Sequence, residues 1–225
     1  MKLLHGDAFL FDLDATLVDS SACIENIWRI WSGKYRFEHG RVMEAVHGRT
    51  IAETMAKVAP HMNSVSFIAE VQEIAIAELK NVKEVRGAHR FLSSLPPESW
   101  AIVTSGPRQV AQASIRNAGL PMPAIMITAE DVARGKPDPE PYLAAAHRLG
   151  VSPQRCIVFE DSMAGIESGI GAGATVIALT TTHCAEDLTG LQFLIHDFEC
   201  IDARISDAGT GARFGVAIDC GEPRK

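Results

Sequence analysis

The sequence lacks several features that mark exported, membrane-bound or nucleic-acid-binding proteins. Its five cysteines are odd in number, widely scattered and free of CxxC spacing, which disfavours a disulfide framework and a zinc site. The apolar stretch at the N-terminus is too short for a signal peptide, and no later run approaches membrane-spanning length. A net charge of −7 argues against a nucleic-acid partner, although a small anion can still bind locally. These absences predict an unexported, cytoplasmic protein with no membrane or nucleic-acid partner.

Five apolar runs predict the strands of a parallel sheet. The chain has 225 residues, 47% of them apolar, and is long enough to bury a substantial core. The runs are rich in branched and aromatic residues and span 8–11, 100–103, 156–159, 175–179 and, more weakly, 124–127. Helical patterns lie between them, the clearest of which has Asp138 as its N-cap and stops at Gly150. Alternating strands and helices predict an α/β core with a doubly wound, Rossmann-like parallel sheet.

A long helical stretch interrupts this alternation after the first strand. Residues 20–85 show helical periodicity and no convincing strand, over a length too great for one crossover helix. We therefore predict an α-helical cap domain of residues 19–85, inserted into a core domain formed by residues 1–18 and 86–225. The tail after Ile201 predicts a terminal β-hairpin.

Two aspartates, Asp12 and Asp14, follow the first predicted strand in the segment FLFDLDATL. Ligand sites of open α/β sheets gather at the carboxyl ends of strands, where both residues would lie. One carboxylate can attack phosphorus and form an aspartyl-phosphate, while the other can protonate the leaving group and then activate water. Alone, the pair is weak support for a function, because acids at strand ends often only cap or face solvent.

Hydroxyls and a lysine follow two other predicted strands. Thr104 and Ser105 lie between a strand and a helix, where hydroxyls and free backbone N–H groups could meet phosphoryl oxygens. Lys136, in the loop sequence GKP, could balance the charge of a nucleophile and a phosphoryl group. The simpler interpretations are that Ser105 caps a helix and that Lys136 is solvated.

Glu160 and Asp161 end a further predicted strand and indicate a metal site. Two adjacent acids such as Asp12 and Asp14 need a cation, because repulsion would otherwise keep one of them protonated. Carboxylate oxygens of Asp12 and Asp161, a backbone carbonyl of Asp14 and waters would supply the oxygen shell that magnesium prefers. The simpler interpretation is an acidic helix start favoured by the helix dipole.

The ordered set DLDATL, TS, GKP and ED, each at a strand end, resembles the haloacid dehalogenase-like hydrolase superfamily over nearly the whole chain. The helical insertion and the stretches GKPDPEPYLAAA and EDSMAGIESGIGAG are similar to its sugar- and polyol-phosphatase branch. The resemblance implies hydrolysis of a small phosphorylated sugar or polyol with Mg²⁺ as cofactor. It also implies one role for each strand-end residue: Asp12 as nucleophile, Asp14 as acid and base, Thr104 and Lys136 as phosphate binders, and Asp161 as magnesium ligand with Glu160 assisting.

Ala15 departs from the family pattern, in which glycine usually stands at this position. If the position needs a positive φ, Ala15 carries some strain. The second aspartate, Asp14, favours phosphatase over dehalogenase members of the superfamily, which lack it because displacing a halide needs no leaving-group proton. Two alternatives stay open: a phosphosugar mutase with the same nucleophile, and a non-catalytic binding protein on the same scaffold.

The segment AVHGRTIAET is the strongest candidate for substrate choice in the predicted cap. It resembles the specificity loop of the family, and His47, Arg49 and Thr50 offer polar groups for sugar hydroxyls. A solvated surface loop is nearly as good an interpretation. Trp28 and Trp31, three residues apart, are expected to pack inside the cap and not to bind a sugar.

Overall fold

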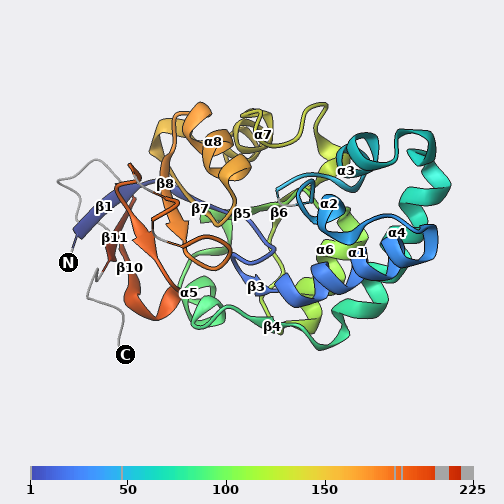
Figure 1. The fold of residues 1–225 in the computed structure, drawn as a ribbon. Coiled ribbons are helices and arrows are strands. Elements are labelled where there is room, and N and C mark those ends of the chain that lie inside the picture. The colour runs from blue at the N-terminus through green and yellow to red at the C-terminus, as the bar shows by residue number, and fades with distance from the viewer. Residues whose placement is uncertain (1, 47, 185, 189, 206–212, 219–225) are drawn as a thin grey trace.

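A six-stranded sheet forms the centre of the molecule (Figure 1). The computed structural model describes residues 2–46, 48–184, 186–188, 190–205 and 213–218. Every neighbouring pair of strands in this sheet is parallel. In spatial order the strands are β6 (Ile125–Ile127), β5 (Trp100–Val103), β2 (Ala8–Phe11), β7 (Cys156–Glu160), β8 (Thr175–Leu179) and β9 (Leu194–Ile195). All five predicted strands are confirmed, and β9, the sixth, is too short to show a pattern in the sequence.

Helices cover both faces of this sheet. They are α5 (Ala88–Ser93), α6 (Arg108–Asn117), α7 (Glu140–Leu149) and α8 (Met163–Gly171). Successive side chains of a strand point to opposite faces, so Phe9 and Phe11 of β2 join the cluster that contains α5 and α6. Ala8 and Leu10 join the second cluster, with α7 and α8. The predicted doubly wound α/β architecture is therefore confirmed.

The start of α7 differs from the sequence prediction by one position. Pro139, and not Asp138, is the N-cap, with φ of −71° and ψ of −10°. Asp138 still satisfies a free N–H group of the first turn, because its Oδ1 accepts a hydrogen bond from the backbone of Glu140 at 2.9 Å. Gly150 ends the helix with a φ of +69°, as predicted.

Four helices fill the stretch between β2 and β5 that the sequence marks as helical. They lie between two short antiparallel strands, β3 (Val18–Asp19) and β4 (Lys83–Glu84). The prediction of no strand in residues 20–85 was therefore wrong at β4, which has only two residues and is too short to show a pattern in the sequence. The four are called the cap helices below: α1 (Ser21–Tyr35), α2 (His39–Met43), α3 (Ile51–Val58) and α4 (Val65–Glu78). None of the helices in the described residues is long and apolar enough to cross a membrane.

A second, three-stranded sheet is built from both ends of the chain. The predicted hairpin is confirmed as β10 (Ile201–Ile205) and β11 (Phe214–Ile218), which pair antiparallel. The N-terminal strand β1 (Lys2–Gly6), which the sequence did not predict, pairs with β11. Figure 1 shows this sheet at the end of the core opposite the cap helices. Six short 3₁₀ helices complete the described elements, at Pro60–Met62, Leu79–Asn81, Pro97–Ser99, Ala129–Asp131, Pro153–Arg155 and Phe198–Cys200.

Candidate active site

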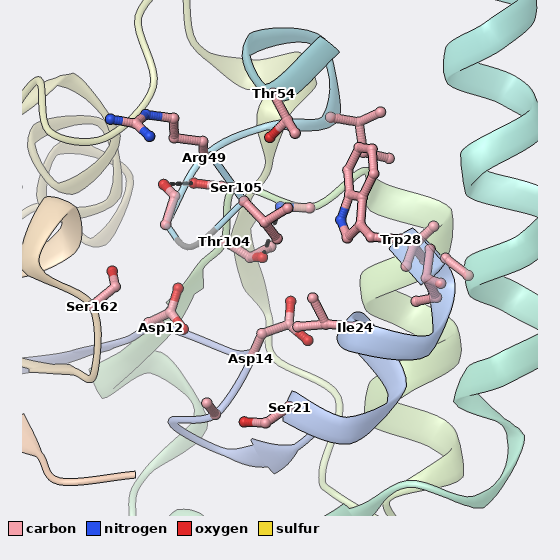
Figure 2. A pocket seen from close by; sticks show the side chains of 18 of the residues that line it. Asp12, Asp14, Ser21, Ile24, Trp28, Arg49, Thr54, Thr104, Ser105 and Ser162 are labelled. Carbon is pink, nitrogen blue, oxygen red and sulfur yellow. Dashed lines mark hydrogen bonds between the residues drawn. The ribbon is translucent and has the colours of Figure 1, made fainter. Parts of the chain in front are cut away.

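The carboxyl ends of three neighbouring strands bring the predicted site residues together. Asp12 follows β2, Thr104 follows β5 and Glu160 ends β7, and these strands are adjacent in the sheet. Lys136 reaches the same edge from the loop between β6 and α7. Parallel strands end at a common edge, which is why residues far apart in the sequence meet here. Figure 2 shows Asp12, Asp14 and Thr104 around one cavity.

Lys136 is the buried cation of the site, with 2% of its surface exposed. Its Nζ donates to Oδ1 of Asp12 and to Oε1 of Glu160, each at 2.6 Å, and to the carbonyl of Val103 at 3.0 Å. Burial alone would lower the pKa of Lys136, but the charges of Asp12 and Glu160 hold it well above its usual range. Removing one partner of such a buried pair typically costs 3–5 kcal/mol. Lys136 is therefore held as a charged group beside Asp12.

Glu160 is fully buried and accepts hydrogen bonds on both carboxylate oxygens. Oε1 accepts from Lys136 and from the hydroxyl of Tyr142, the latter at 3.1 Å. Oε2 accepts from the backbone N–H groups of Asp161 and Ser162, both at 2.8 Å, and from the Ser162 hydroxyl at 3.0 Å. Sequence reasoning missed Tyr142 and Ser162, because no motif marks a contact that depends on how α7 packs across β2, β5 and β6. Glu160 thus fixes both Lys136 and the loop after β7.

Asp12, Glu160 and Asp161 form a buried acidic cluster whose carboxylate oxygens lie within 4.8 Å of one another. Burial raises the pKa of Asp12 well above its usual range, although Lys136 opposes the shift. Burial, with the nearby charge of Glu160, raises the pKa of Asp161 to about 7. Three carboxylates face one ammonium group, so the ionised cluster has a surplus of negative charge that a divalent cation would balance. This oxygen donor set fits a hard divalent metal ion.

Asp14 lies on the loop that leaves β2 and has its own partner. The hydroxyl of Ser20, just before α1, donates to Oδ1 of Asp14 at 2.7 Å. Burial raises the pKa of Asp14, and the Ser20 hydrogen bond only partly opposes this shift. The protonated form is therefore favoured more than in an exposed aspartate, which suits an acid that gives up a proton. The role of Ser20 was not predicted, because its contact with Asp14 forms only when the loop after β2 turns back toward the strand end.

Ala15 takes the left-handed conformation that its position in the loop requires, with a φ of +60°. For an alanine this conformation costs roughly 1–2 kcal/mol. The carbonyl of Ala15 accepts a hydrogen bond from the Thr181 hydroxyl at 2.6 Å, and its N–H donates to Val18 at 2.7 Å. These two bonds hold the loop in place. The predicted strain at Ala15 is therefore present.

Thr104 and Ser105 lie where the core meets the loop before α3. Oγ1 of Thr104 accepts a hydrogen bond from the backbone of Gly106 at 3.0 Å, and the Ser105 hydroxyl donates to the carbonyl of Gly48 at 3.0 Å. Gly48 has a φ of +73°, and a Cβ there would lie 2.9 Å from Oγ of Ser162. The glycine therefore lets this loop approach the strand ends closely.

A cavity of about 130 Å³ lies between the strand ends and the cap helices (Figure 2). Its polar floor consists of core residues with charged or hydroxyl side chains: Asp12, Asp14, Thr104, Ser105, Asp161, Ser162 and Thr182. Most lining residues from the helical insertion are apolar, and these are called the apolar wall below: Ile24, Ile27, Trp28, Val46, Ile51, Val71, Ala75 and Leu79. The cavity therefore combines polar groups of the core with apolar side chains of the insertion.

Of the predicted specificity residues that the structure describes, Arg49 lines the cavity and Thr50 does not. Thr50 is the N-cap of α3, and its hydroxyl and backbone N–H share a capping box with Glu53. The spacing T-x-x-E already indicated that role in the sequence. Arg49 lines the cavity mouth but is exposed, and Figure 2 shows its side chain running away from Asp12 and Asp14. His47 lies outside the described residues.

Trp28 packs inside the cap and also faces the cavity. It is 4% exposed, and its ring lies edge-on to Trp31 with centroids 5.6 Å apart. Trp31 is fully buried and stacks on Phe37 at 5.2 Å, so its predicted packing role is confirmed. Figure 2 shows the indole nitrogen of Trp28 on the ring edge that faces Thr104. Of these two indole nitrogens, that of Trp31 is the one that is buried with no hydrogen-bond partner among the described residues.

Comparisons with known proteins agree with this arrangement. Residues 9–179 match the family described as haloacid dehalogenase-like hydrolase. Hexitol phosphatase A of Escherichia coli is 37% identical over 86% of this chain and 92% of its own length. Glycerol-1-phosphate phosphohydrolase 2 of Saccharomyces cerevisiae is 34% identical over 88% of this chain and 85% of its own length. A HAD hydrolase of Entamoeba histolytica superposes with a TM-score of 0.74 at 25% identity, over 85% of this chain and 93% of that one.

Proposed function

The chain belongs to the haloacid dehalogenase-like hydrolases, and we propose that it is a phosphatase of small sugar or polyol phosphates with Asp12 as nucleophile. The contact between Asp12 and Lys136 carries this proposal. Because Lys136 binds Oδ1 of Asp12, the second oxygen, Oδ2, is left for attack on phosphorus. Relatives that are named phosphatases favour hydrolysis over the phosphosugar mutase and over a non-catalytic scaffold.

The first step forms a bond between Oδ2 of Asp12 and phosphorus and breaks the bond to the ester oxygen. Asp14 gives the departing alkoxide its proton, and Oδ2 of Asp14 is suited to this because Oδ1 is held by Ser20. In the second step a water attacks phosphorus, Asp14 takes its proton, and the aspartyl-phosphate bond breaks. The products are the alcohol and inorganic phosphate, and Asp12 is restored.

Mg²⁺ is the proposed cofactor, held by Asp12, Asp161 and the backbone carbonyl of Asp14. When bound, it supplies positive charge for the phosphoryl oxygens. Glu160 belongs to the same cluster, but both of its oxygens already accept hydrogen bonds, so we assign it the positioning of Lys136. Thr104 and Ser105 line the cavity where a phosphoryl group would lie.

The proposed division of the chain into two domains is the one that the sequence predicts. Residues 19–85 form the cap domain and residues 1–18 with 86–225 form the core. The pairing of β3 with β4 supports this division, because it brings the two ends of the insertion together. The free thiols of three described cysteines, Cys23, Cys156 and Cys184, fit a reducing compartment such as the cytoplasm.

Release of inorganic phosphate tests the proposed function. The purified protein with Mg²⁺ should release phosphate from p-nitrophenyl phosphate and from members of a panel of sugar and polyol phosphates. Asp12→Asn should retain the fold by circular dichroism and lose more than about a thousandfold in kcat. No release from any ester, or isomerised product in place of phosphate, would contradict the proposal.

A further inference from the structure

The two sets of residues that line the cavity differ in chemistry, and the apolar wall bears on which substrate fits. Among the described residues, the polar side chains that the helical insertion contributes to the cavity lining are those of Ser21, Arg49 and Thr54. The hydroxyl of Thr54 donates to the carbonyl of Ala45 at 3.1 Å, and the core residue Ser105 donates to the carbonyl of Gly48. Arg49 points away from the acids (Figure 2). Ser21 lies beside Asp14 at the floor and not on the apolar wall.

On the premise that the proposed phosphatase function holds, we propose that the apolar wall selects phosphate monoesters whose remote carbons carry few hydroxyl groups. With the phosphoryl group at Asp12, the remote carbons of the substrate face Ile24, Trp28, Val46 and Val71. A hydroxyl buried there loses its hydrogen bonds to water and gains none from the aliphatic side chains of the wall. A CH₂ group in the same place is favoured by leaving water. Deoxy sugar phosphates and short aliphatic phosphates fit this wall better than fully hydroxylated hexose phosphates.

Trp28 makes one exception in the apolar wall. Its side chain is largely buried, with 4% of the residue exposed, and Figure 2 shows the indole nitrogen on the ring edge that faces Thr104. The N–H of a largely buried tryptophan usually finds a hydrogen-bond partner, and an oxygen of the bound substrate would supply one here. Trp28 therefore donates to a single oxygen of the substrate, and the wall around it excludes further hydroxyls.

Matched substrate pairs test the inference on the unmodified protein. Each pair differs by one hydroxyl remote from the phosphoryl group: glucose 6-phosphate with 2-deoxyglucose 6-phosphate, and glycerol 1-phosphate with 1,2-propanediol 1-phosphate. The member lacking the hydroxyl should have a kcat/KM higher by about tenfold. Equal values within each pair, or a preference for the fully hydroxylated member, would overturn the inference.

Two variants and a control test the wall itself. Ile24→Thr adds a hydroxyl to the wall and should shift the preference toward the fully hydroxylated member of each pair by about threefold. Ile30→Thr on the same helix is the matched control, because Ile30 is 39% exposed and lies outside the cavity lining. Trp28→Phe keeps a ring but removes the N–H, so it should lower kcat/KM for 2-deoxyglucose 6-phosphate about fivefold more than it lowers kcat/KM for n-butyl phosphate, which has no remote oxygen to accept that hydrogen bond.

The outcomes separate this inference from the proposed function. Phosphate release with no preference within the pairs, and no shift in Ile24→Thr relative to Ile30→Thr, refutes the inference and leaves the phosphatase function standing. No phosphate release from any ester, p-nitrophenyl phosphate included, refutes the proposed function and the inference with it.

Discussion

Replacement of Gly165 by alanine tests how firmly the fold holds the buried carboxylate of Glu160. Gly165 lies in α8, and a Cβ there would be 1.6 Å from Oε1 and 1.9 Å from Cδ of Glu160. The carboxyl group would have to move, and it would then lose its hydrogen bonds to Lys136 and to the backbone of Asp161 and Ser162. Lys136 would no longer be fixed beside Asp12.

The size of the effect follows from two opposing contributions. Breaking a buried ion pair typically costs 3–5 kcal/mol, whereas alanine in place of glycine inside a helix gains about 1 kcal/mol. Gly165→Ala should therefore lower the free energy of unfolding by about 2–4 kcal/mol in urea denaturation. Displacement of Lys136 from Asp12 should lower kcat on p-nitrophenyl phosphate by roughly a hundredfold.

Gly33→Ala in α1 is the matched control, because nothing lies within 4 Å of the added Cβ. It should stabilise the protein by about 0.5–1 kcal/mol and leave turnover unchanged. In a Glu160→Ala background, Gly165→Ala should lose its destabilising effect, since the clashing carboxylate is gone. If Gly165→Ala matches Gly33→Ala in both stability and turnover, the reasoning about Glu160 is refuted.

Three further predictions concern charged groups. Asp14→Asn should lose more turnover on sugar phosphates than on p-nitrophenyl phosphate, whose leaving group needs no proton; equal losses argue against the acid role. Asp161→Ala should raise the Mg²⁺ concentration for half-maximal activity by at least about tenfold, whereas Lys136→Ala should lower kcat without that shift; superimposable titrations contradict the assignment of Asp161. Burial raises the pKa of Asp131, but hydrogen bonds from Thr128 and Arg148 outweigh it and lower the pKa to about 2. The ionised carboxylate of Asp131 therefore stabilises the fold by roughly 1 kcal/mol after solvent screening. This contribution is present above about pH 4 and is lost as the pH falls toward 2. The urea midpoints of the wild type and Asp131→Asn should therefore differ at pH 7 and converge near pH 2.

The strand-end residues could be predicted because their position follows from sequence order and sheet geometry alone. Asp12 and Thr104 each come directly after an apolar run, and parallel strands end at one edge. Strand β1 could not be predicted in the same way, because it forms only by pairing with β11 at the other end of the chain. Its short polar-flanked sequence shows no pattern of its own.

The contacts that position the site could not be predicted from local patterns. Tyr142 reaches Glu160 only because α7 packs across β2, β5 and β6, and Gly165 matters only because α8 passes over the same carboxylate. The position of Trp28 likewise depends on how α1 lies over the cavity. The role of Thr50 was readable, since its spacing to Glu53 is that of a capping box.

The most direct measurement of the central claim is the detection of a phosphoryl group on Asp12. The protein is mixed with Mg²⁺ and excess p-nitrophenyl phosphate, quenched in acid within the first turnovers, and mapped by peptide mass spectrometry. We expect one acid-stable, hydroxylamine-labile phosphoryl group on the peptide that contains Asp12, and none in Asp12→Asn. Turnover without any phosphorylated peptide, or a phosphoryl group on another residue, would contradict the account.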